Sequence, residues 1–74
     1  MSWAGALEKA ERWIQTLPIP KKVRGEFINL DDFIETVPGT GGERTILLRA
    51  AKRILEKRGA TVRFTDPTLP TDFE

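Results

Sequence analysis

The sequence contains no cysteine and no histidine, and these two absences exclude several kinds of chemistry. Disulfide bonds, zinc-finger sites and nucleophilic catalysis by cysteine or histidine all need side chains that the chain lacks. No apolar run approaches the roughly 18 residues of a membrane-spanning helix, and the N-terminus lacks the basic and then apolar pattern of a signal peptide. We therefore expect a cytoplasmic protein that has no membrane partner, no cofactor and no enzymatic activity.

The length and composition indicate one small folded domain. The chain has 74 residues, of which 39% are hydrophobic and 31% are charged, and this balance is typical of a globular domain rather than of a disordered segment. A domain of this size buries only about 60% of the surface that its unfolded chain exposes. Chains this small often gain stability from a partner subunit, so a homodimer is one expected arrangement.

Charge is distributed unevenly along the chain, although the net charge is only +1. Residues 38–63 carry seven basic and two acidic side chains, whereas residues 64–74 carry three acidic side chains and no basic one. A basic segment inside a nearly neutral chain indicates an anionic partner. An ordinary solvated helix face gives the same pattern, so both interpretations stay open.

The first half of the chain predicts a long helix and a short one. Apolar residues recur at helical spacing from Trp3 to Leu17, which predicts a helix from residue 2 or 3 to residue 16, capped by Ser2 and ended by Pro18. Residues 25–28 follow as a short extended segment. Asn29 is typical of an N-cap, and it predicts a second helix over residues 30–37.

The second half predicts a break, a basic helix and a strand. Residues 38–42 interrupt the helical pattern, and Thr40 with Glu43 matches a capping box that begins a helix over residues 43–58. Gly59 is expected to end this helix in left-handed geometry. Residues 60–64 alternate between apolar and polar, as in a half-buried strand whose natural partner is the extended segment at 25–28.

These elements predict a mainly α member of the α+β class, with three helices and a small two-stranded sheet. Residues 1–64 form the single domain, and residues 65–74 form an acidic, proline-containing C-terminal tail. The expected core is made of the apolar residues of the helical stripes and strands: Trp13, Ile14, Leu17, Phe27, Phe33, Ile34, Val37, Leu47, Leu48, Ala51, Ile54, Leu55, Val62 and Phe64.

The stretch VPGTGGERT, residues 37–45, has glycines and threonines like those of a nucleotide-binding loop. A phosphate-binding loop also needs a lysine after its glycines and a buried parallel strand before them. Here Glu43 follows the glycines, and the preceding segment reads as helix. We therefore interpret the stretch as a turn between two helices.

The order of the predicted elements over residues 2–64 resembles winged-helix and helix-turn-helix nucleic-acid-binding domains. The stretch RTILLRAAKRILEKRG, from Arg44 to Gly59, looks like the recognition helix of such regulators. In that family the extended segment before the second helix pairs with the strand after the third helix, so the resemblance implies an antiparallel two-stranded sheet. It also implies that basic and hydroxyl residues near the helix start enter the major groove of DNA.

Two groups of candidate contact residues follow from this resemblance. Arg44, Thr45 and Arg49 would face base edges or phosphates. The second group would contact the nucleic-acid backbone and position the protein without specifying sequence: Lys52, Arg53, Lys21, Lys22 and Arg24. Each of these basic side chains also has a plain interpretation as a solubilising surface charge.

The sequence thus supports two functional hypotheses. The first is a small non-enzymatic DNA-binding protein of the helix-turn-helix kind, a transcriptional regulator. The alternative is a protein-interaction module, such as an accessory subunit or a phage-type inhibitor, whose basic helix 43–58 faces an acidic protein surface. Trp3 and Trp13 could stack on the bases of single strands, but their helical spacing favours a place in the core.

Overall fold

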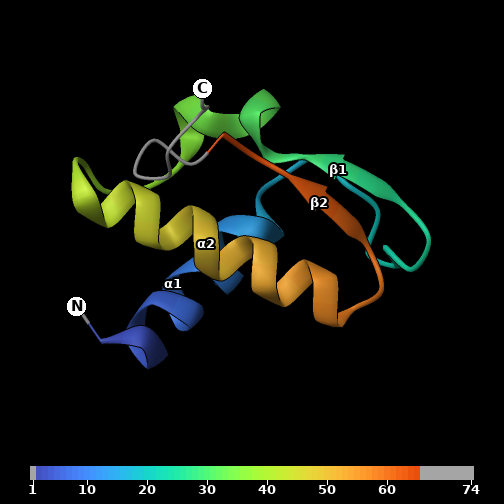
Figure 1. The fold of residues 1–74 in the computed structure, drawn as a ribbon, viewed down its shortest axis with the longest axis horizontal. Helices are drawn as coiled ribbons and strands as arrows, with labels where there is room; N and C mark the ends of the chain where they lie inside the picture. The colour runs from blue at the N-terminus through green and yellow to red at the C-terminus, as the bar shows by residue number, and fades with distance from the viewer. Residues whose placement is uncertain (1, 66–74) are drawn as a thin grey trace, which may run out of the picture.

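The computed structural model describes residues 2–65, which form five elements in one chain (Figure 1). In order they are α1 (Trp3–Gln15), β1 (Phe27–Asn29), the 3-10 helix η1 (Leu30–Thr36), α2 (Gly42–Lys57) and β2 (Thr61–Arg63). The α+β class, the three helices and the pairing of the two predicted strand segments are therefore confirmed. Of the predicted tail at 65–74, residues 66–74 lie outside the described residues.

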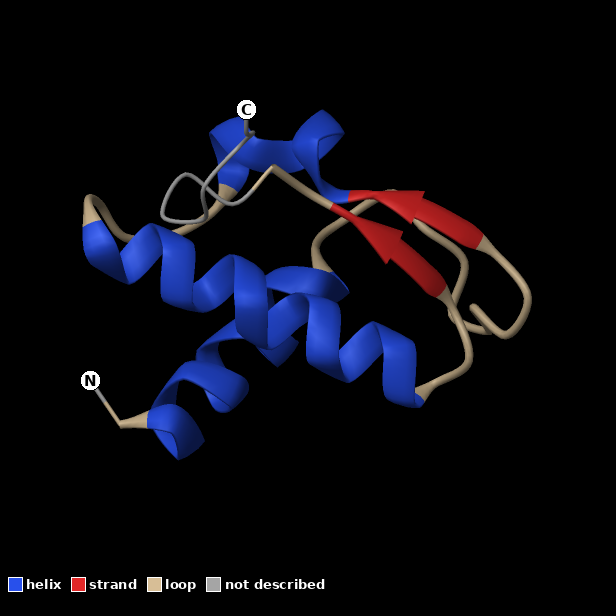
Figure 2. Ribbon diagram, in the orientation of Figure 1, coloured by secondary structure: helices blue, strands red, loops and turns tan. Residues whose placement is uncertain are grey.

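The longest element, α2, lies between α1 and the sheet (Figure 2). α1 packs against one side of α2, and β2 packs against the other. Fully buried alanines lie on both helices, at positions 6 and 10 of α1 and 50 and 51 of α2. Side chains this small let the two helix backbones approach closely, so a short chain can still enclose a continuous core.

The start of α1 and the start of η1 follow the predicted capping rules. The Ser2 hydroxyl accepts a hydrogen bond from the Gly5 backbone N–H at 3.0 Å. The Asn29 side chain accepts one from the Asp31 backbone N–H, also at 3.0 Å. Both caps satisfy backbone donors that have no partner inside their own helix.

The second helix is a 3-10 helix, and this geometry suits its side-chain pattern. In a 3-10 helix residues three apart lie on the same side. Leu30 is fully buried, Phe33 packs against the core, and Thr36 accepts a hydrogen bond from the Trp13 indole at 2.9 Å. The period of three therefore turns one face of η1 toward α1 and the core.

The predicted capping box at Thr40 and Glu43 is wrong. Gly41 occupies the N-cap of α2 with φ 59° and makes no side-chain cap hydrogen bond. Glu43 instead reaches the Lys9 ammonium at 2.8 Å and so joins α2 to α1. The break at residues 38–42 is confirmed, because the chain reverses there through glycines with positive φ.

The end of α2 is a Schellman motif, as the prediction for Gly59 implies. Gly59 has φ 99°, its N–H donates to the Glu56 carbonyl at 3.0 Å, and the Ala60 N–H donates to the Leu55 carbonyl at 3.1 Å. Both Leu55 and Ala60 are buried, which adds the apolar contact that accompanies this motif. The chain therefore leaves α2 in a fixed direction and enters β2 directly.

The predicted antiparallel sheet is wrong, because β1 and β2 run parallel. Phe27 lies opposite Thr61, and Ile28 lies opposite Val62. Residues 30–60 connect the strands, and α2 carries the chain back across the sheet before β2 begins. A crossover that contains a helix is the usual connection between parallel strands, whereas the antiparallel direction was taken from the winged-helix resemblance.

Most of the predicted core is buried, with one clear error at Phe27. Ile28 and Val62 point toward α2, so their strand neighbours point away, and Phe27 is 64% exposed. A shift of one residue along a strand moves every side chain to the other face, so the prediction failed on register. Four predicted core residues are only partly buried: Phe33, Ile34, Ile54 and Phe64.

Candidate functional site

The start of α2, which the sequence predicted to read DNA bases, faces inward. Arg44 is half-buried, and its guanidinium donates to the Ile34 carbonyl at 2.9 Å. Its Nε atom is buried and makes no hydrogen bond within the described residues. Thr45 is only 7% exposed. These two side chains join α2 to η1 and to the core, and neither is presented to a large ligand.

The exposed face of α2 carries a row of basic residues. Arg49, Arg53 and Lys57 are all exposed and follow one another at intervals of four, so they lie along one face of the helix. Lys52 lies at the edge of this face and is half-buried, with its ammonium 3.3 Å from the Glu56 carboxylate. A pair this exposed contributes little to stability.

The loop that carries Lys21, Lys22 and Arg24 lies beside the C-terminal end of α2. The Gly25 N–H donates to the Gly59 carbonyl at 2.9 Å, which joins the two chain segments. Arg24 packs so closely on Gly59 that a Cβ added to this glycine would lie 3.1 Å from the Arg24 Cα. Two basic segments that are far apart in the sequence therefore meet at one place in the fold.

We call this surface the basic end. It consists of the exposed cations of the loop and of the last two turns of α2: Lys21, Lys22, Arg24, Arg53, Lys57 and Arg58. The sequence prediction named the first four of these as contact residues and did not name Lys57 and Arg58, which also complement the negative end of the helix dipole. The dipole favours cations at the C-terminal end of α2, and these exposed cations are still accessible to an anionic ligand.

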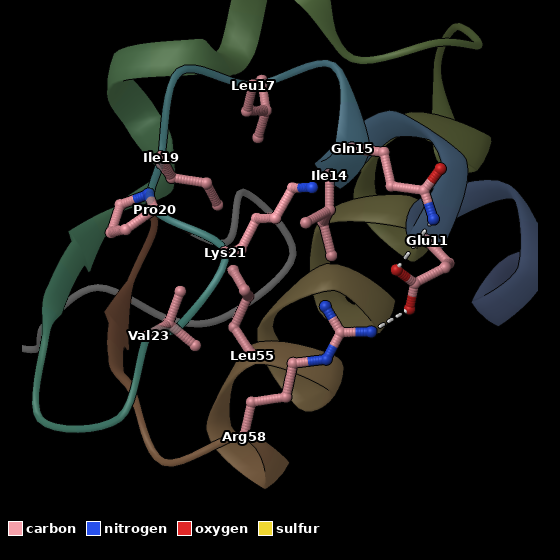
Figure 3. A pocket seen from close by; sticks show the side chains of 10 residues that line it. All are labelled: Glu11, Ile14, Gln15, Leu17, Ile19, Pro20, Lys21, Val23, Leu55 and Arg58. Carbon is pink, nitrogen blue, oxygen red and sulfur yellow. Dashed lines mark hydrogen bonds and ion pairs between the residues drawn. The ribbon is translucent and has the colours of Figure 1, made fainter.

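A groove of about 540 Å³ lies between α1, the loop after it and the last turn of α2 (Figure 3). Lys21 and the ion pair between Arg58 and Glu11 supply its charged groups, and Gln15 also donates to Glu11. The other lining side chains are apolar: Ile14, Leu17, Ile19, Pro20, Val23 and Leu55. The sequence analysis did not predict this groove, because its walls come from three separate segments.

A second hollow, of about 450 Å³, lies on another side of α1. It is lined by Trp3, Ala4, Leu7, Glu8, Glu11, Arg53, Ile54 and Lys57. Glu11 lines both hollows, so the two are neighbours around the same end of α2. The basic end therefore combines cations with accessible apolar surface.

Residues 2–65 contain no group of three or more carboxylate, thiol or imidazole side chains arranged to hold a metal ion. None of the helices described is both long enough and apolar enough to cross a membrane. Comparisons with protein-family models, with curated proteins and with solved structures found no match.

Proposed function

We propose that this protein is a small non-enzymatic nucleic-acid-binding protein that contacts phosphates through its basic end. The observation that carries the proposal is the meeting of the Lys21–Arg24 loop with the C-terminal end of α2. Six exposed cations belong to these two segments, and one of them, Arg58, is paired with Glu11. Lysine and arginine are the residues that neutralise nucleic-acid phosphates, and clustering raises the local potential that attracts a polyanion.

The acidic residues around this end are fewer than the cations. Glu11 is paired with Arg58, so these two residues add no net charge, and Glu8 near Arg53 and Lys57 lowers the local charge by one. Glu56 is paired with Lys52 on the edge of α2. Glu26 is exposed just after the loop and lowers the local charge by one. The basic end thus keeps an excess of positive charge, which is what supports a polyanionic partner over a neutral one.

The placement of Arg44 and Thr45 limits the kind of recognition that we propose. Side chains at the start of α2 cannot reach base edges while they bond to η1 and fill the core. We therefore propose binding mainly through the phosphate backbone, with Arg49 as the remaining candidate for a base contact. A helix-turn-helix regulator that reads sequence from the start of α2 would need these side chains turned outward.

Binding through phosphates has a characteristic dependence on salt. For duplex DNA the slope of log affinity against log salt is about −0.9 for each phosphate neutralised. If four or five of the six cations engage, the slope should be about −4. A fluorescence anisotropy titration of a labelled duplex at several salt concentrations measures it. Absence of binding at low salt, where even non-specific contacts register, would remove nucleic acid as the partner.

The apolar groove beside Lys21 supports a second candidate, a protein-interaction module. Its walls are mainly apolar and its volume of about 540 Å³ is suited to a few side chains of a partner. Association through such a groove depends on burial of apolar surface and is therefore nearly insensitive to salt. The DNA titration separates the two candidates, because a protein-interaction module without affinity for nucleic acid should show no binding to the duplex even at low salt.

A further inference from the structure

Trp3 differs from the other tryptophan because its indole is open to solvent. Trp3 is 48% exposed, whereas Trp13 is 4% exposed and donates its indole N–H to Thr36 at 2.9 Å. Both residues belong to the apolar stripe of α1, but Trp3 lies in the first turn. Among the described residues Phe27 is the other large apolar side chain with such exposure, and it lies on the sheet.

The surroundings of Trp3 combine apolar surface with positive charge. Leu7 and Ile54 lie beside it in the hollow of about 450 Å³, and both are partly buried against the core. Arg53 and Lys57 line the same hollow from α2, one turn apart on its exposed face. An aromatic ring next to two cations is the arrangement that binds single strands, since the ring stacks on a base and the cations bind phosphates.

Two carboxylates also line this hollow and act against an anionic ligand. Glu11 is engaged by Arg58 and by Gln15, so its charge is largely compensated. Glu8 is exposed and lies five residues after Trp3 on α1. The negative charge of Glu8 repels a phosphate, so a variant without this charge should bind nucleic acid more tightly. The site therefore predicts one substitution that raises affinity as well as substitutions that lower it.

We infer that Trp3, Arg53 and Lys57 form a site for an unpaired base and its neighbouring phosphates, so that the ligand is single-stranded nucleic acid. This inference rests on the proposed function and names its substrate class. A base inside a duplex is stacked on both faces and cannot reach the indole. A single strand exposes its base faces, and stacking on an aromatic side chain tolerates any sequence. This agrees with the inward placement of the side chains that would otherwise read base edges.

The test compares three labelled ligands of equal length, about 12 nucleotides each. They are an oligothymidine strand, an abasic strand with the same phosphates, and a duplex. Anisotropy titrations at low salt use the wild-type chain and the variants Trp3→Ala, Trp3→Phe and Glu8→Gln. Circular dichroism and thermal melting of each variant show whether the fold is kept, and the half-exposed position of Trp3 makes this the expected result.

Stacking predicts a selective loss. Trp3→Ala should weaken oligothymidine binding by about 5- to 100-fold, Trp3→Phe should keep most of the affinity, and Glu8→Gln should raise it about 2- to 5-fold. Binding of the abasic strand and of the duplex should change less than about 2-fold in Trp3→Ala, because neither presents a free base.

The two proposals fail in different ways. If the wild-type protein binds the duplex but Trp3→Ala leaves oligothymidine binding unchanged, the stacking site is overturned and the proposed function stands. An equal loss for all three ligands overturns the stacking site as well, because the effect would not depend on bases. If no nucleic acid binds at low salt, both proposals fall together.

Discussion

The two ends of α2 differ in what their polar side chains do. At the N-terminal end Arg44 bonds to η1, Thr45 is buried, and Glu43 pairs with Lys9 of α1. At the C-terminal end Lys57 is exposed, and the Schellman motif at Gly59 turns the chain beside a second basic segment. Both ends are joined to α1 by an ion pair, Glu43 with Lys9 and Arg58 with Glu11, but only the C-terminal end also presents exposed cations such as Lys57 to solvent.

This difference shows that a basic helix is not a uniform surface. Neighbouring elements decide which of its charges remain accessible, and here η1 and α1 cover the start of α2 while the loop at 21–24 adds charge to its end. The account therefore predicts that substitutions at the start of α2 change stability, whereas substitutions of cations at its end change binding.

The largest effect is expected for the apolar residue that supports the C-terminal end. Leu55 is fully buried, so Leu55→Ala should lower the free energy of unfolding by about 2–5 kcal/mol through lost apolar burial and the cavity left behind. Urea denaturation measures this, and the loss is large for a domain this small. Phe27→Ala is the matched control, since a side chain that is 64% exposed should cost less than about 1 kcal/mol. Equal losses for the two variants would show that the sheet register is wrong.

A smaller effect is expected for Arg44, and it separates structure from binding. Arg44→Ala removes the charged donor to the Ile34 carbonyl, and we expect a loss of about 1–3 kcal/mol in unfolding free energy. Arg53→Ala, on the exposed face of the same helix, should change stability by less than about 0.5 kcal/mol. In DNA titrations the order should reverse, with Arg53→Ala weakening binding more than Arg44→Ala. If Arg44→Ala weakened DNA binding more than Arg53→Ala, the start of α2 would be the contact surface.

The smallest effect concerns the turn that positions the basic end. Gly59 has φ 99°, and an added Cβ would press on the Arg24 backbone, so Gly59→Ala should destabilise the domain by about 1–2 kcal/mol. Gly42→Ala is the matched control, because a Cβ there meets open space at an ordinary φ and should cause no loss. Thermal melting compares the stability of the two variants. A lower melting temperature in Gly42→Ala alone would contradict the backbone geometry described for both glycines.

The parts of the fold that the sequence predicted well depend on residues close together in the chain. The cap at Ser2, the cap at Asn29 and the stop at Gly59 each involve contacts within five residues. The helix stripes depend on the same short range. Such signals can be read from one sequence because no distant segment is needed to interpret them.

The parts that could not be predicted depend on segments far apart in the chain. The direction of β2 relative to β1 is decided by the path of residues 30–60, and no pair of neighbouring residues records it. Phe27 and Ile28 are adjacent apolar residues that point to opposite faces of a strand, and which of them is buried depends on the position of α2. Arg44 is the same kind of case, since its partner belongs to η1.

The candidate site also has parts that the sequence predicts and parts that depend on the fold. The sequence identifies the cations and predicts the basic helix that carries three of them. That the loop with Lys22 lies beside the end of α2 with Lys57 follows from the contacts of Arg24 and Gly25 with Gly59. The groove beside Lys21 and the openness of Trp3 also depend on how α1 crosses α2.

The central claim, that the basic end of α2 binds nucleic acid, is tested most directly by two double charge reversals with the same change in net charge. Lys22→Glu with Lys57→Glu alters both segments of the basic end, and Arg12→Glu with Arg63→Glu alters exposed cations on α1 and β2. Anisotropy titrations should show that the first pair weakens DNA binding at least about 10-fold and makes the salt slope shallower by about 2. The control pair should weaken binding by no more than about 3-fold, through the long-range field alone. Equal losses for the two pairs, with circular dichroism showing both folded, would contradict the claim.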